Sequence, residues 1–156
     1  MKQRPPDRRL PIIVADAAQA REALPLRWSP ASGTLANAFW PGALTIAFAT
    51  EPPLPGWLSA RKEVAVRAPD HELIAGIAAR VGPLLMTSAN RHGAATPTSV
   101  RDVLAHLAFP PAISVDAGRL SEASSTLVNT NLPCPEVERE GAIPASVIAE
   151  ALRDAR

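Results

Sequence analysis

The sequence predicts an α/β (α+β) protein with helices packed on a mixed sheet. Short β-branched or apolar runs of strand length recur along the whole chain. Some of these runs are separated by stretches with apolar residues at helical spacing, and others follow one another directly. Parallel neighbours need crossover connections, whereas directly connected strands pair antiparallel. The pattern therefore favours a mixed sheet over a doubly wound parallel one.

Seven runs have the composition of strands. The run at 11–15 is rich in β-branched residues, and those at 43–50 and 84–87 are typical of buried strands. The run at 63–67 alternates and ends on a charged residue. The remaining strands are expected at 112–116, at 125–129 and, more weakly, at 136–139.

Two helices are expected in the first half of the chain. Asp16 is a suitable N-cap for a helix through about Leu24, which Pro25 ends. Asp70 is expected to cap a second helix, which Gly82 and the following proline end. The apolar stripe of this second helix consists of Leu73, Ile74, Ile77, Ala78 and Val81.

Two more helices are expected in the second half. Ser99 and Asp102 resemble a capping box at the start of one helix. Its apolar positions are Val100, Val103, Leu104 and Leu107. Pro144 suits the first residue of a final helix. That helix carries Val147, Ile148, Ala151 and Leu152.

Length and composition fit one domain over residues 1–156. The chain is 47% hydrophobic and 20% charged, unlike a disordered or fibrous protein, and its net charge of +1 gives no overall attraction to nucleic acid or membrane. The lone Cys134 excludes an internal disulfide and fits a reducing compartment. No apolar run approaches the roughly 20 residues of a membrane span, and no apolar segment follows the basic N-terminus. We therefore expect a cytoplasmic protein that does not bind a membrane.

Several kinds of site are disfavoured. The three histidines, at positions 71, 92 and 106, have neither HxxxH nor Cys/His spacing, so a protein-bound metal is not expected. The chain contains no GxGxxG, no GxxxxGK[ST] and no GxSxG motif. Chemistry is therefore sought among polar residues at strand ends and loop starts, where α/β sheets place ligands.

Basic side chains mark two candidate positions. Nearly all the basic residues are Arg, which suits bidentate contacts to phosphate or carboxylate, although codon usage explains the count as well. Lys2, Arg4 and Arg8 are among four cations within eight residues, which either neutralise a polyphosphate or form an ordinary basic terminus. Arg67 closes the strand at 63–67, where it either points into a cleft or forms a surface ion pair.

Hydroxyl and amide groups mark further positions. Ser88 and Asn90 follow the strand at 84–87, where such groups can hydrogen-bond an anion. Thr98 lies at a helix start that favours phosphate, although capping explains a threonine there equally well. Ser125 and Thr126 open the strand at 125–129, and Arg139 lies fourteen positions after Ser125 and two before Gly141.

Taken together, these segments resemble the YrdC-like family, the threonylcarbamoyl-AMP synthases of tRNA modification. The SAN and WPG motifs and the VAVR segment are the most specific of them. They occur in the family's order and spacing over nearly the whole chain. The matching segments are KQRP (2–5), FWPGALT (39–45), VAVRAPDH (64–71), PLLMTSANRHG (83–93), TPT (96–98), SSTLVN (124–129) and REGAI (139–143).

The resemblance implies a twisted mixed parallel and antiparallel sheet with flanking helices around a positively charged cavity. It also implies a reaction in which L-threonine, bicarbonate and ATP, with Mg²⁺, give L-threonylcarbamoyladenylate and pyrophosphate. The product would serve the proteins that place N6-threonylcarbamoyladenosine at position 37 of tRNA. A non-catalytic member that binds nucleotide, tRNA or double-stranded RNA is the alternative.

The resemblance also assigns roles residue by residue. Lys2 and Arg4 match the family's KxR pair and are the expected catalytic residues. The expected ATP contacts are Arg4, Arg8, Asn90, Thr98 and Arg139. The expected threonine contacts are Arg67, Ser88 and Ser125.

The chain also departs from the family's pattern. Ala43 replaces a usual proline, His92 a usual serine, and Ser124 and Asn129 acidic residues. Ile13 stands where some members have histidine. The chain begins at the KxR motif, so we expect a domain shortened at its N-terminus. The open sheet edge that this would leave suggests a homodimer.

Overall fold

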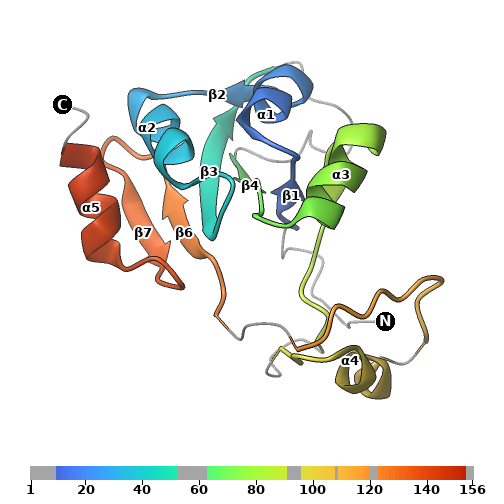
Figure 1. The fold of residues 1–156 in the computed structure, drawn as a ribbon. Helices are drawn as coiled ribbons and strands as arrows, with labels where there is room; N and C mark the ends of the chain where they lie inside the picture. The colour runs from blue at the N-terminus through green and yellow to red at the C-terminus, as the bar shows by residue number, and fades with distance from the viewer. Residues whose placement is uncertain (1–9, 53–62, 91–95, 108, 120–122, 154–156) are drawn as a thin grey trace. The chain divides into compact units, whose positions relative to one another are not determined.

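A computed structural model of the chain describes residues 10–52, 63–90, 96–107, 109–119 and 123–153. It contains two compact units. The larger combines Pro11–Met86 with Ser124–Arg156, and the smaller combines Met1–Leu10 with Thr87–Ala123. The larger unit holds the sheet and most of the helices (Figure 1).

The larger unit is built on a mixed sheet that has seven strands in the described part of the chain. Their spatial order is β5-β1-β4-β3-β6-β7, with β2 also paired to β3. The pairs β1/β4 and β3/β6 are parallel, and the other pairs are antiparallel. The predicted mixed sheet is confirmed. The strands are β1 (Ile12–Ile13), β2 (Leu26–Arg27), β3 (Leu44–Thr50), β4 (Glu63–Arg67), β5 (Leu84–Leu85), β6 (Thr126–Asn129) and β7 (Glu136–Arg139).

Strand β3 lies at the centre of this sheet between β4 and β6. Leu44, Ile46 and Phe48 are fully buried, and the two residues between them are also buried. The last two residues of the strand are half-buried. A strand covered on both faces has no solvent side, which explains why its sequence is mostly apolar. Phe48 also meets the Trp28 ring, with centroids 4.8 Å apart.

Two of the helices in the larger unit were predicted by their caps and apolar positions. Asp16 caps α1 (Ala17–Ala23) by accepting a hydrogen bond from the Gln19 N–H, as predicted. Helix α5 (Ala145–Arg153) follows Pro144 and buries Ile148, also as predicted.

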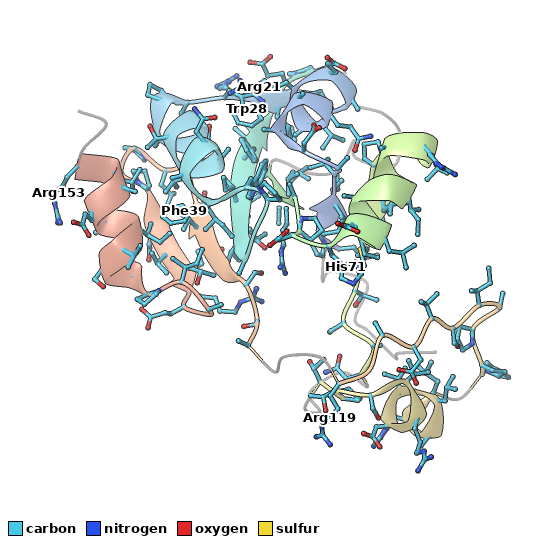
Figure 2. The ribbon with its side chains drawn as sticks, in the orientation of Figure 1. Arg21, Trp28, Phe39, His71, Arg119 and Arg153 are labelled. Carbon is cyan, nitrogen blue, oxygen red and sulfur yellow. The ribbon has the colours of Figure 1, made fainter. Side chains whose placement is uncertain are left out.

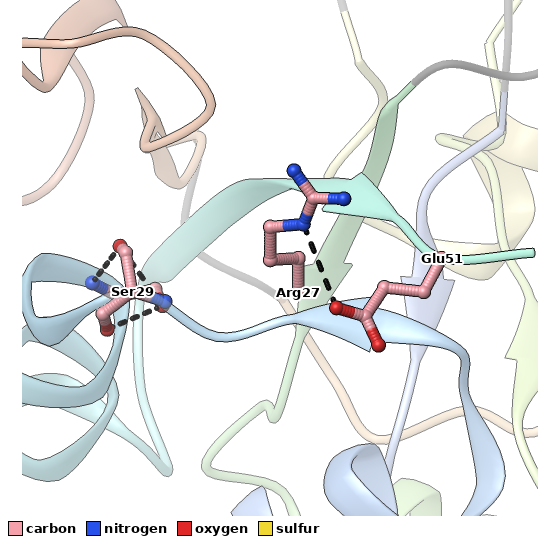
Figure 3. A network of polar contacts seen from close by, with 4 residues as sticks. Arg27, Ser29 and Glu51 are labelled. Atoms are coloured by element: carbon pink, nitrogen blue, oxygen red, sulfur yellow. Dashed lines mark hydrogen bonds and ion pairs between the residues drawn. The ribbon is translucent and has the colours of Figure 1, made fainter.

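Helix α2 (Pro30–Phe39) was not predicted, because its small and polar residues form no wide apolar stripe. It begins with a capping box. The Ser29 hydroxyl accepts from the Ser32 N–H at 3.1 Å, and the Ser32 hydroxyl accepts from the Ser29 N–H at 2.9 Å (Figure 3). Leu35 and Ala36 are buried where α2 packs on β3 and α5. Packing against these elements compensates for the weak helix propensity of its residues.

Helix α3 (Glu72–Val81) corrects two predictions. Its N-cap is His71 and not Asp70, and the His71 side chain makes no capping hydrogen bond. Most of its predicted apolar stripe faces outward, because α3 fully buries only Ala78. The helix ends at Gly82, whose φ of 91° suits glycine, as predicted.

The smaller unit contains α4 (Val100–His106), which Ser99 caps by accepting from the Asp102 N–H. None of the α4 side chains is buried. The strand predicted at 112–116 is absent, and Ile113 and Val115 are exposed. A lone extended segment without a hydrogen-bonded neighbour is not a strand, whatever its composition. Among the described residues, no helix is both long enough and apolar enough to span a bilayer.

Candidate functional site

Arg67 is held at the end of β4 by the turn that precedes β3. Its Nε donates a hydrogen bond to the Gly42 carbonyl at 2.8 Å, and the Gly42 N–H donates to the Ala68 carbonyl at 2.8 Å. A Cβ on Gly42 would lie 2.5 Å from the Phe39 carbonyl oxygen, so no larger residue fits without a backbone shift. The WPG motif therefore orients the Arg67 guanidinium.

Arg139, at the end of β7, is held by the residue just before β6. Its Nη2 donates to the Ser125 carbonyl at 2.9 Å and lies 3.2 Å from the Ser125 hydroxyl. That hydroxyl also shares a 2.7 Å hydrogen bond with the Thr45 hydroxyl of β3. Thr45 and Ser125 are both buried. The buried Ser125 hydroxyl, itself held by Thr45, therefore fixes the position of the Arg139 guanidinium.

Thr126 fixes the loop that follows Arg139. Its hydroxyl donates to the Ile143 carbonyl at 2.6 Å and accepts from the N–H groups of Gly141 and Ile143 at 3.0 and 3.1 Å. A Cβ on Gly141 would lie 2.6 Å from the Ser125 carbonyl carbon and still closer to the Ser124 carbonyl oxygen. Only glycine allows this close approach, which keeps Arg139 beside Ser125.

The two guanidinium groups repel each other. Burial lowers the pKa of Arg67 below its ordinary value, and the positive charge of Arg139 lowers it further. In the described part of the chain, neither arginine forms an ion pair with a carboxylate. Two neighbouring cations without a counter-charge, beside buried hydroxyls, form a site suited to an anion.

The Sua5/YciO/YrdC family model, described as telomere recombination, matches residues 1–141 of the chain. The chain belongs to the Sua5/YciO/YrdC family. The resemblance inferred from the motifs is confirmed.

Longer curated proteins are similar to this chain in sequence. The threonylcarbamoyl-AMP synthase of Bacillus subtilis (strain 168) is 32% identical over 149 residues, which are 91% of this chain and 42% of that protein. The threonylcarbamoyl-AMP synthase of Stutzerimonas stutzeri (strain A1501) is 37% identical over 99 residues, 60% of this chain and 50% of that protein. The chain spans about half the length of the curated relatives it matches.

Solved structures of family members share the fold. The crystal structure of P. abyssi Sua5 complexed with L-threonine has a TM-score of 0.86 at 28% identity, over 97% of this chain and 45% of that one. E. coli YciO has a TM-score of 0.79 over 94% of this chain and 72% of its own, but at 20% identity it supports the fold alone.

The other predicted site residues belong to the smaller unit or lie outside the described residues. Ser88, Asn90 and Thr98 lie in the smaller unit. There, the Ser88 hydroxyl donates to Asn90 Oδ1 at 2.7 Å, and Arg119 donates to the Thr98 hydroxyl at 3.3 Å. Ser99, not Thr98, caps α4. Lys2, Arg4 and Arg8, together with His92, lie outside the described residues.

The residue analysis missed Thr45, and it gave Thr126 as a candidate without its role in holding the loop after Arg139. Thr45 is a polar residue within the buried, mostly apolar part of β3, and this was the one local feature that could have indicated it. Thr126 lies next to Ser125 in a segment already matched to the family, but its three hydrogen bonds reach residues 15 to 17 positions away. Sequence spacing does not reveal such contacts.

Proposed function

We propose that this chain forms L-threonylcarbamoyladenylate and pyrophosphate from L-threonine, bicarbonate and ATP. The observation that carries the proposal is the pair of Arg67 and Arg139, oriented by the backbone and by buried hydroxyls and without a carboxylate partner in the described residues. The names of the curated relatives and the L-threonine complex of P. abyssi Sua5 support this choice of substrates.

Arg67 would bind the threonine carboxylate, and the Ser125 hydroxyl would hydrogen-bond the amino acid beside it. Arg139 would bind the nucleotide phosphates. Since the Arg139 charge acts on Arg67, the two substrates would be held next to each other. Ser88 as a threonine contact, and Asn90 and Thr98 as nucleotide contacts, are proposed from their motif positions. The positively charged cavity of the family is proposed on the same basis.

The chemistry requires positioning and charge neutralisation, with no covalent enzyme intermediate. Threonine and bicarbonate condense to a carbamate with loss of water. A carbamate oxygen then bonds to the α-phosphorus, the bond from that phosphorus to the bridging oxygen breaks, and pyrophosphate leaves. Arg139, together with Lys2, Arg4 and Arg8, would stabilise the charge that develops on pyrophosphate.

Mg²⁺ would neutralise phosphate charge during this reaction and would enter with ATP. In the described part of the chain, no group of three or more His, Cys, Asp and Glu side chains is arranged to hold a metal ion. The product would pass to the proteins that modify adenosine 37 of tRNA.

The test is pyrophosphate release from ATP, measured with and without threonine and bicarbonate. Arg67→Ala is expected to raise the KM for threonine roughly tenfold to a hundredfold, because a charge-assisted contact is lost. Arg139→Ala is expected to weaken ATP binding by a similar factor. The matched control is Arg27→Ala, which removes only an exposed ion pair to Glu51 at 3.5 Å (Figure 3).

The outcomes separate the two functions considered. Release that depends on both threonine and bicarbonate supports the synthase. ATP or RNA binding without turnover supports the non-catalytic alternative, and binding to RNA should then weaken steeply with added salt. An unchanged threonine KM in Arg67→Ala would remove the assignment of Arg67.

A further inference from the structure

Helix α3 presents an apolar face to solvent. Leu73, Ile77 and Val81 are 45%, 39% and 69% exposed, although each is a large hydrophobic residue. They recur every four residues, so they lie along one side of the helix. The adjoining side of the helix packs on the domain, where Ala78 is fully buried and its carbonyl accepts from Gln19 Nε2 at 2.7 Å.

This face contains a groove of about 480 Å³. Gly76 lies in the middle of it, and a Cβ built there would meet no atom within 4 Å. The glycine therefore leaves an open notch between Leu73 and Ile77. A carboxylate and a guanidinium lie at opposite ends of the groove, on Glu72 and Arg80.

We propose that this face binds the same face of a second copy of the chain, with the two α3 helices antiparallel. A two-fold axis between Gly76 and Ile77 places each Ile77 opposite the Gly76 notch of the other copy. The same axis brings Glu72 of each copy to within one helical turn of Arg80 of the other. A face with opposite charges at its two ends is complementary to itself when inverted, as a two-fold contact requires.

The charge pattern favours a second copy over an unrelated partner of one charge. A basic or acidic partner would match one end of the groove and be repelled at the other.

The interface would be small, because α3 has only 10 residues. Interfaces at the low end of the size range form weak or transient complexes. We expect a dissociation constant in the micromolar range or weaker. Sedimentation velocity of the full chain, from micromolar to near-millimolar concentration, measures this association directly.

The first pair of variants tests the apolar contact. Ile77→Lys is expected to leave the chain monomeric at all these concentrations. Val147→Lys is the matched control, because Val147 on α5 is also 39% exposed and lies away from α3. It should leave the association unchanged. Circular dichroism checks that both variants stay folded, as substitution at exposed sites predicts.

A charge exchange tests the antiparallel geometry. Glu72→Arg or Arg80→Glu alone turns two attractive contacts into repulsive ones, so each should weaken association about tenfold. The double exchange should restore it. A wild-type chain that is monomeric throughout would overturn the proposal. So would dimerisation that survives Ile77→Lys or is equally lost in Val147→Lys, or an absence of rescue in the double variant.

Discussion

Replacing Thr126 with valine tests whether one buried hydroxyl holds the loop that follows Arg139. Thr126 is fully buried, and its hydroxyl makes three hydrogen bonds to backbone groups of Gly141 and Ile143. Valine has nearly the same shape and keeps the methyl group. The substitution therefore removes polar contacts without opening a cavity.

The expected loss of stability follows from these contacts. Each hydrogen bond contributes about 0.5–1.5 kcal/mol net, and backbone groups left without a partner add to the loss. Because Gly141 and Ile143 are half-exposed, water can replace part of what is lost. We expect the free energy of unfolding to fall by about 2–4 kcal/mol in Thr126→Val. This is a large share of the roughly 5–15 kcal/mol typical of a domain.

The control is Thr126→Ser, which keeps the hydroxyl and loses one buried methyl group. Its expected loss is about 1 kcal/mol. Urea denaturation followed by circular dichroism measures both variants, and an unchanged slope m would show that only stability has changed. A serine variant that is as unstable as the valine variant would refute the argument, because the loss would then come from packing and not from the hydroxyl.

Three further predictions concern other contacts. Gly141→Ala should reduce the free energy of unfolding by about 2 kcal/mol or more in urea denaturation, because its Cβ clashes with backbone atoms. Gly76→Ala should raise the free energy of unfolding by about 0.5–1 kcal/mol, because a Cβ there meets no atom and alanine favours the helix. Sodium sulfate should raise the Tm of the wild type by more than it raises that of Arg67→Ala. A bound anion would offset both the burial and the Arg139 charge that lower the Arg67 pKa. Equal rises in a thermal-shift assay would contradict an anion site there. Arg21→Ala should lower the free energy of unfolding by about 0.5–1 kcal/mol, because it removes a cation–π contact. The Arg21 guanidinium lies 3.7 Å from the centroid of the Trp28 ring (Figure 2). Unaltered urea unfolding would show that this contact contributes nothing.

Local sequence patterns predicted those elements whose cause is local. Asp16 caps α1 because its side chain reaches an N–H three residues away, and the same holds for Ser99 and α4. The buried run of β3 and the proline before α5 are likewise visible in a short window of sequence. Such features need only neighbouring residues, so the sequence is sufficient to predict them.

Patterns failed where the deciding partner is distant or absent. The apolar spacing of α3 predicts a helix correctly, but it cannot say which side of that helix the domain covers, and the domain covers Ala78. The run at 112–116 has strand composition, yet it pairs with no strand among the described residues of its unit. Helix α2 shows the reverse case, in which contact with β3 and α5 stabilises a helix of weak propensity.

The chain's own residues were enough to predict the mixed sheet and the family, because motif order and local chemistry are written along the chain. Only the folded molecule decided that Arg67 is oriented by Gly42, that Ser125 and Thr45 hold Arg139, and that one helix face is left uncovered. The physical reason is that hydrogen bonds and burial depend on distances in space. Strand pairing brings Thr45 and Ser125 to 2.7 Å although 80 positions separate them in the sequence.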